Sequence, residues 1–155
     1  MGDHPAWGVA VLRIVLGVIF VMHGWYAWAI LGPRELADLM LRVGNPPGLS
    51  DGLAWYAIVA QLLGGLLLIV GFHTPWVALG LVPITAGGLF LFRWPQGFFL
   101  HAAVFDQPAG RVVVGGFEYS LLILIATLAL VMTGGGALSI DHARGHRINT
   151  RKGVL

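Results

Sequence analysis

One stretch of the sequence decides the fold class: GVAVLRIVLGVIFVMHGWYAWAIL, residues 8–31. Apart from Arg13 and His23, it is almost wholly apolar. A helix needs about 20 such residues to cross the ~30 Å hydrocarbon core of a bilayer. The residues before it hold no basic cluster and no clear small-residue cleavage site ends it, so we do not expect a cleaved signal peptide. The stretch therefore predicts a membrane-spanning helix.

The composition of the whole chain agrees with a membrane protein. Of its 155 residues, 57% are hydrophobic and only 10% are charged, and the mean hydropathy is +0.84, far from the balance of a soluble domain. There is no cysteine, which excludes disulfides, thiolate metal sites and thiol–disulfide catalysis by this chain. The net charge of +2 arises mainly in the C-terminal tail and forms no basic face of a soluble domain, so we expect no nucleic-acid partner.

Three further segments approach the length and apolarity needed to span the bilayer. With the first, we place the spans at residues 8–31, 53–72, 76–93 and 114–133. The second and third are joined by only three residues, so these helices should be antiparallel neighbours. The sequence predicts an all-α, up-down-up-down four-helix membrane bundle over residues 1–142, followed by a basic tail over residues 143–155.

The connections carry readable signals. Residues 33–43, PRELADLMLRV, place apolar and charged side chains on different sides of a helix, a pattern typical of a short amphipathic helix on the membrane surface. We expect Ser50 or Asp51 to cap the second span, and Thr74 to cap the third.

The distribution of basic residues predicts the orientation. The density of the tail favours both termini in the cytoplasm and a multi-pass protein of the plasma (inner) membrane. On the side of the termini lie Arg13, Arg144, Arg147, Arg151 and Lys152, and on the opposite side lie Arg34, Arg42, Arg93 and Arg111.

Four polar residues fall at the same depth in the membrane. At 1.5 Å per residue, His23 lies roughly 12 Å before the end of the first span and Gln61 roughly 12 Å after the start of the second. Arg93 closes the third span and Glu118 opens the fourth. Polar groups inside a bilayer are costly, so this shared layer is a candidate functional site.

Each residue of the layer also has a structural alternative. Arg93 and Glu118 could form an ion pair or snorkel to the interface, and Gln61 could form an interhelical hydrogen bond. His23 could do the same, or bind a ligand head group, or ligate haem. A bis-histidine haem would need His101 as the second ligand, which disfavours haem.

Small residues share helix faces with polar ones, as is typical where two helices approach closely. Arg13 lies some 15 Å from His23 toward the other face of the membrane, so we expect a structural role, by snorkelling or by capping carbonyls. We expect five residues to have a structural role in helix packing. Arg13 shares a helix face with Gly17 and Gly24, and Gly64 and Gly65 share one with Gln61.

Five segments together resemble the DoxX family of small four-helix membrane proteins. They are LRIVLGVIFVMHG (12–24), QLLGGLLLIVG (61–71), PQGFF (95–99), GGFEYSLLIL (115–124) and LSID (138–141). The family includes the small membrane subunit of a thiosulfate:quinone oxidoreductase. The resemblance implies a membrane bundle that works beside electron-transfer or redox partners, at the quinone pool. It identifies no substrate.

This chain departs from the family at two positions. Relatives often have a lysine where this chain has Ala27 and a glutamate where it has Gln61. If the two charges form an ion pair in relatives, losing both avoids an unpaired charge in the membrane. The hypothesis requires Ala27 and Gln61 to lie on the same side of the bundle.

These observations predict an accessory or quinone-linked subunit of a redox or respiratory assembly. His23 and Gln61 would hydrogen-bond a quinone carbonyl. Trp25, Tyr26 and Trp55 would enclose the ring, with polar support from Arg93 and Glu118. We expect no intrinsic cofactor and no metal, but a bilayer and a larger membrane or periplasmic redox complex or a homo-oligomer as partners. The alternatives are a purely structural module that docks a larger complex, and the membrane part of a thiosulfate:quinone oxidoreductase.

Overall fold

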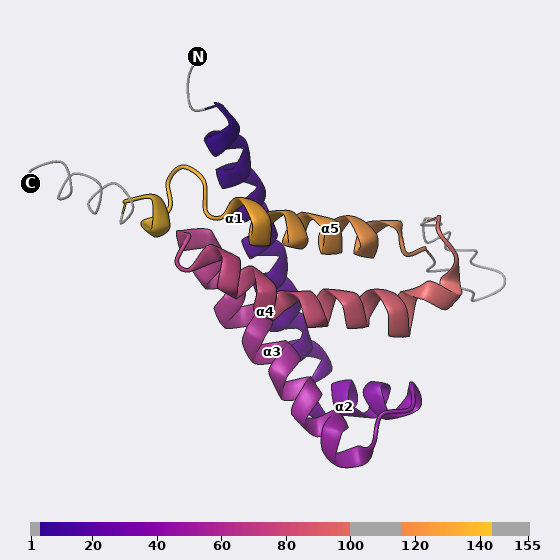
Figure 1. Ribbon diagram of the computed structural model, residues 1–155. Coiled ribbons are helices and arrows are strands. Elements are labelled where there is room, and N and C mark those ends of the chain that lie inside the picture. The colour runs from indigo at the N-terminus through magenta and orange to yellow at the C-terminus, as the bar shows by residue number, and fades with distance from the viewer. Residues whose placement is uncertain (1–3, 100–115, 144–155) are drawn as a thin grey trace, which may run out of the picture.

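All regular structure in the described part of the chain is helical. The computed structural model describes residues 4–99 and 116–143, with no strand among them (Figure 1). The basic tail from residue 144, His101 and Arg111 lie outside the described residues. In chain order the elements are α1 (His4–Trp25), η1 (Tyr26–Leu31), α2 (Pro33–Arg42), α3 (Pro47–Val70), α4 (Thr74–Gly87), η2 (Gly88–Arg93), η3 (Trp94–Gln96) and α5 (Glu118–Thr133).

Three continuous helical stretches are long and apolar enough to cross a membrane: Pro5–Leu31, Pro47–Val70 and Thr74–Gln96. The all-α prediction is therefore confirmed for the described residues, and the chain has the helices of a membrane protein. The fourth apolar helix, α5, has 16 residues, fewer than the roughly 20 of a full span. The up-down-up-down order of four spans stays a prediction.

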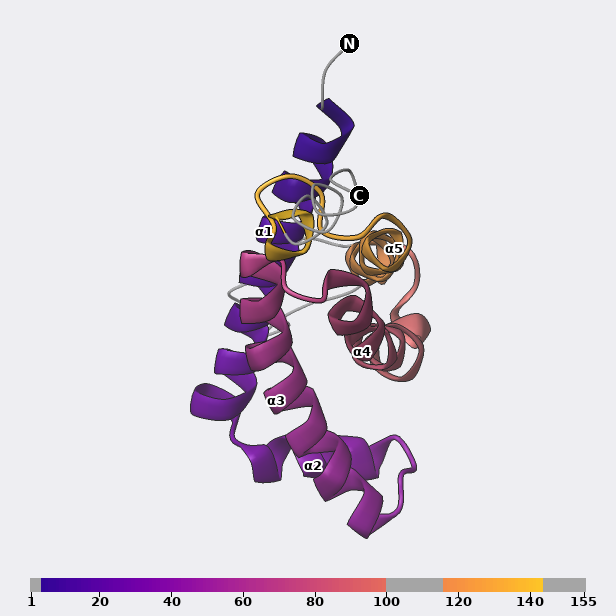
Figure 2. The same cartoon turned by 60° about the vertical axis from the view of Figure 1, so that its left-hand side comes forward.

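The helices form two pairs that cross. α1 packs along α3, and α4 packs along α5. Figures 1 and 2 show the α4–α5 pair lying across the α1–α3 pair, with α2 against the far end of α3. A small core joins the pairs where they meet: Leu16, Phe20, Leu68, Ala78, Leu81 and Leu130. Because these residues lie in one part of the helices, the pairs are free to diverge elsewhere.

Glycines let α1 and α3 approach closely. A Cβ atom on Gly17 would lie 2.7 Å from the carbonyl oxygen of Gly65, and a Cβ on Gly65 equally close to that of Gly17. Farther along, a Cβ on Gly24 would lie 2.9 Å from the backbone nitrogen of Leu62. Side chains at these positions would push the helix backbones apart.

Arg13 is the one charged side chain among those fully buried in the described residues, and it joins three segments. Its Nη1 donates to the carbonyl oxygens of Leu68 and, at 2.9 Å, Ile69, near the C-terminus of α3. Its Nη2 donates to Leu138 O at 3.0 Å. Of the two structural roles expected for Arg13, the structure shows carbonyl capping, in which a cation also complements the negative end of the α3 dipole.

The start of α4 is capped by a distant side chain. The two carboxylate oxygens of Asp141 each accept a backbone N–H at 2.8 Å, one from His73 and one from Thr74. The prediction that the side chain of Thr74 caps this helix is wrong, because Thr74 is already its first residue and makes no side-chain cap. A carboxylate satisfies two N–H groups at once, which one hydroxyl does not.

The predicted cap of the second span is also wrong. α3 begins at Pro47, six residues before the expected start at residue 53, and has no side-chain cap. Ser50 is buried inside the helix and its hydroxyl donates to Pro46 O at 3.0 Å. A proline in the first helical turn has the correct φ and lacks an N–H that would need a partner, so the helix can begin there.

Residues 138–141, Leu-Ser-Ile-Asp, form what we call the C-terminal latch. Leu138 O accepts from Arg13, and the Asp141 carboxylate caps α4. In addition, Asp141 N donates to Gly71 O at 3.1 Å. Ser139 is buried and packs against Gly71, which has a φ of 69°. The latch therefore ties the end of α5 to the turn between α3 and α4.

Replacing Arg13 should strongly destabilise the protein. Arg13→Leu leaves three carbonyl oxygens without a charged donor, and bonds to charged groups are worth about 1.5–3 kcal/mol each, so we expect a loss of at least about 3 kcal/mol. The measurement is unfolding by sodium dodecyl sulfate in mild detergent. Arg34→Leu, on the exposed face of α2, is the matched control, and equal losses in the two variants would contradict the assignment.

The Asp141 cap should make stability depend on acid pH. Burial raises the pKa of Asp141, but the hydrogen bonds from Thr74 and His73 together lower it by more. The net result is a pKa below the ordinary value of an aspartate. Its contribution is then present above the unfolded pKa of about 3.9 and is lost as pH falls through the folded value. We expect Asp141→Ala to cost about 1–2 kcal/mol at pH 7.

The wild-type and Asp141→Ala curves should converge as pH falls below about 3.9, measured by the same unfolding titration. Asp38→Ala, an exposed carboxylate on α2, controls for charge alone. A difference between wild type and Asp141→Ala that is independent of pH would show that the carboxylate does not carry the effect.

Candidate ligand-binding cavity

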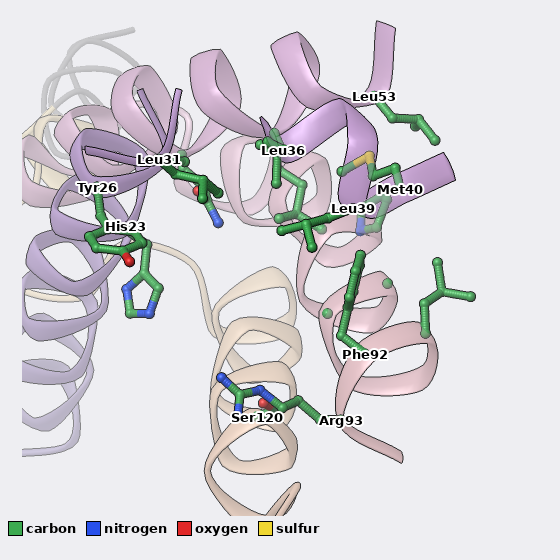
Figure 3. A pocket seen from close by; sticks show the side chains of 18 of the residues that line it. His23, Tyr26, Leu31, Leu36, Leu39, Met40, Leu53, Phe92, Arg93 and Ser120 are labelled. Atoms are coloured by element: carbon green, nitrogen blue, oxygen red, sulfur yellow. The ribbon is translucent and has the colours of Figure 1, made fainter. Parts of the chain in front are cut away.

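A cavity of about 740 Å³ lies where the two helix pairs diverge. α1 and η1 contribute one wall, α3 another, and α4 with η2 a third, while α5 adds Tyr119 and Ser120 (Figure 3). Most of the lining is apolar, with His23 and Gln61 among the polar exceptions. The volume falls within the ~300–1,000 Å³ typical of small-molecule sites.

Helix α2 forms the end of the cavity. Its apolar residues Leu36, Leu39 and Met40 line the cavity, and Figure 3 shows their side chains directed into it. Its charged residues are exposed. The predicted amphipathic helix therefore forms, but its apolar side covers this cavity where we expected it to rest on the membrane surface. The periodicity indicates an apolar face and does not say what covers it.

Two π-helical segments flank the cavity. η1 contributes Tyr26, Ala27 and Leu31, and η2 contributes Gly88, Phe92 and Arg93 among others. π-helical turns are rare and occur frequently at functional sites, where they alter the direction of side chains. Both continue a regular α-helix without a break in the span, so the two helices that diverge are also the two that change their winding beside the cavity.

His23 faces the cavity from α1. Its ring is not covered by other side chains. It lines the cavity and projects toward the space between α1 and α5 (Figure 3). Nδ1 forms a hydrogen bond with Ile19 O at 2.9 Å, one helical turn earlier. Among the described residues, no hydrogen bond occupies the other ring nitrogen, Nε2. Within the described residues, one ring nitrogen of His23 is therefore hydrogen-bonded to its own helix, and the other has no partner.

Gln61 faces the same cavity from α3. Its side-chain amide is half-buried and forms no hydrogen bond within the described part of the chain. The expected alternative, an interhelical hydrogen bond, is therefore not found there. A second, smaller cavity of about 120 Å³ also has His23 and Gln61 in its lining. These two side chains accordingly lie where the cavities meet.

Two other polar groups around the cavity, Tyr56 and Arg93, already have protein partners. The Tyr56 hydroxyl donates to Gly80 O. Arg93 Nη1 donates to Gln96 Oε1 at 3.4 Å, and the expected pairing of Arg93 with Glu118 stays a prediction. Of the four residues in the predicted polar layer, His23, Gln61 and Arg93 line the cavity, and Glu118 does not.

The aromatic side chains around the cavity differ from those expected. Tyr26 lines it, but Trp25 and Trp55 do not and are 49% and 51% exposed on the outside of the helices. Trp25 instead packs edge-on against Trp28, with ring centroids 5.6 Å apart. Sequence reasoning missed the rings that do line the cavity, namely Tyr56, Phe92 and Tyr119.

The missed rings had a weak signal. Tyr56 precedes Gln61 by five residues and Tyr119 follows Glu118 directly, so their depth was readable. The rotation of each helix about its own axis could not be read from the sequence, and this rotation decides whether a ring faces the cavity or the lipid.

The two positions at which the chain departs from the family pattern lie together. Ala27 and Gln61 both line the larger cavity, one from η1 and one from α3. This is the arrangement that the ion-pair hypothesis for relatives requires. In this chain a methyl group and a neutral amide occupy the two positions, so the cavity carries no charge there.

An all-helical membrane protein with a cavity between crossing helix pairs is the class that the fold defines. The chain belongs to the DoxX family, whose model matches residues 8–94. It is similar to the Bacillus subtilis (strain 168) protein named "Putative oxidoreductase CatD", at 25% identity over 134 residues, covering 86% of this chain and 84% of that protein. No solved structure matches the chain.

Single cysteines should test the cavity, since the chain has none of its own. Gly88 lines both cavities and a Cβ there would meet nothing within 4 Å, whereas a Cβ on Gly64 would lie 3.3 Å from the Leu81 side chain. We expect a small uncharged maleimide to label Gly88→Cys much faster than Gly64→Cys in detergent. Mass spectrometry measures the rate at which each variant is labelled. Equal rates for Gly88→Cys and Gly64→Cys would contradict an open cavity.

Proposed function

We propose that this protein is a quinone-binding accessory subunit of a redox assembly in the plasma (inner) membrane, with both termini in the cytoplasm. One observation carries the proposal. His23 and Gln61 face one cavity from two helices that are long and apolar enough to cross a membrane, and neither His23 Nε2 nor the Gln61 amide has a protein partner among the described residues. Unpaired polar groups inside a bilayer are costly unless a ligand or water satisfies them.

A quinone fits the chemistry of this cavity. The quinone ring offers a flat apolar surface to Tyr26, Phe92 and Tyr119, and oxygens at its edge that the Gln61 amide can bind. The chain has no cysteine, so electrons would come from a partner protein. The similarity to a relative whose name includes oxidoreductase supports the redox setting. A thiosulfate:quinone oxidoreductase would be one such assembly, supported by the family resemblance alone.

A second candidate is a structural module that docks a larger complex or a second copy of the chain. The observation that favours it is the exposed Trp25–Trp28 pair on the outer side of α1 and η1. In this case the cavity would hold lipid or remain without a specific ligand, and the outer aromatic residues would matter more than the inner ones.

Substitutions at neighbouring aromatic residues should separate the two candidates. Tyr26 lines the cavity and Trp25 does not, although both are exposed to a similar degree, 57% and 49%. We expect Tyr26→Leu and Gln61→Leu each to weaken binding of decylubiquinone several-fold, up to about tenfold for one hydrogen bond. Trp25→Leu should leave binding unchanged. Binding is measured by native mass spectrometry from mild detergent.

Mass spectrometry of the same preparation identifies copurified lipids and partner proteins. Wild-type protein that binds no quinone, or loses binding equally in Trp25→Leu and Tyr26→Leu, would overturn the quinone proposal. Loss of a copurified partner in Trp25→Leu alone would support the docking module.

A further inference from the structure

The hydrogen bond of His23 to its own helix determines which ring nitrogen carries the proton. Nδ1 lies 2.9 Å from Ile19 O, and a carbonyl oxygen can only accept a hydrogen bond. Nδ1 is therefore the donor. In a neutral imidazole the other nitrogen, Nε2, then has a lone pair and no hydrogen. The side chain presents an acceptor to the cavity.

We propose that His23 Nε2 accepts a hydrogen bond from a ring hydroxyl of the ligand, so that the cavity selects hydroquinone over quinone. This inference rests on the proposed function and adds the redox state that the site prefers. A quinone oxygen has lone pairs only and would face the lone pair of Nε2. A hydroquinone hydroxyl supplies the hydrogen that this nitrogen lacks.

The groups around His23 do not reverse this preference. The Gln61 amide has both a donor and an acceptor, so it can bind either redox form. The titratable and charged groups that line the cavity are Tyr26, Tyr56, Arg93 and Tyr119. Tyr56 already donates to Gly80 O and Arg93 Nη1 to Gln96 Oε1. The hydroxyls of Tyr26 and Tyr119 can both donate and accept, and the oxygens of both redox forms can accept from the remaining N–H groups of Arg93, so these groups can bind either form. No carboxylate from the described elements lines either cavity, so none competes for the hydroxyl.

The preference has a consequence for redox chemistry. If the reduced form binds about tenfold more tightly, the potential of the bound two-electron, two-proton couple rises by about 30 mV. A subunit of this kind would hold the product of quinone reduction or the substrate of hydroquinone oxidation. Either direction leaves the electron transfer itself to a partner.

The test compares three ligands of one ring shape: duroquinone, durohydroquinone and the dimethyl ether of durohydroquinone. Binding is measured anaerobically by native mass spectrometry on the full chain in mild detergent. We expect durohydroquinone to bind about tenfold more tightly than either of the others, as for one hydrogen bond. The ether has the reduced ring but no hydroxyl hydrogen, so it separates hydrogen bonding from ring shape.

Variants test the role of the nitrogen. His23→Leu should weaken durohydroquinone binding to the level of duroquinone and leave duroquinone nearly unchanged. His23→Gln, which restores a side-chain acceptor, should recover part of the preference. Tyr26→Leu should weaken both ligands by the same factor, because it removes packing against the ring. If His23 had a purely structural role, His23→Leu would instead weaken the binding of durohydroquinone and duroquinone by the same factor.

The outcomes separate the inference from the proposed function. Equal binding of durohydroquinone, duroquinone and the ether by wild-type protein would overturn the selectivity and leave quinone binding intact. Tighter binding of duroquinone would also overturn it. Binding of none of the three would overturn both proposals. The comparison in wild-type protein gives this answer even if the His23 variants fail to fold.

Discussion

The buried guanidinium of Arg13 sets the arrangement on which the rest of the structure depends. A charge in the interior needs hydrogen-bond partners. Here Nη1 and Nη2 donate to carbonyl oxygens at the end of α3 and to that of Leu138 in the C-terminal latch. The same latch caps α4 through Asp141. One end of the molecule is therefore tied together by polar contacts between segments more than fifty residues apart.

The opposite end is organised in a different way. Away from Arg13 the helix pairs diverge, and the space between them is lined by side chains from every long helix and closed by α2. Close packing of Gly17 against Gly65 holds α1 to α3, so the opening must lie between the pairs and not within them. One end of the molecule is thus held by polar contacts, and the other end carries the cavity. A cavity formed before a ligand arrives would lower the ordering cost of the binding that we propose.

The cavity depends on a balance between polar and apolar lining. Most of its wall is aliphatic or aromatic, which suits a ligand that partitions into the bilayer. The nitrogen Nε2 of His23 and the amide of Gln61, both without a partner among the described residues, are the groups that would orient the proposed ligand. The absence of charge at Ala27 and Gln61 keeps this point neutral, where the family pattern would place a lysine and a glutamate. The ligand that we propose would therefore be held by hydrogen bonds at the place where the ion-pair hypothesis puts two charges in relatives.

The sequence by itself determined the membrane class, the three long apolar helices and the helix at 33–42, because hydropathy is a local property of the chain. Rise per residue placed His23, Gln61 and Arg93 at one level, and the structure has all three lining one cavity. The sequence did not determine which side chains face inward. Trp25 and Tyr26 are adjacent and equally aromatic, yet only Tyr26 lines the cavity, since helix rotation depends on contacts with other segments. The Asp141 cap, the α2 wall and the bonds of Arg13 likewise join residues distant in the chain, and only the tertiary structure brings them together.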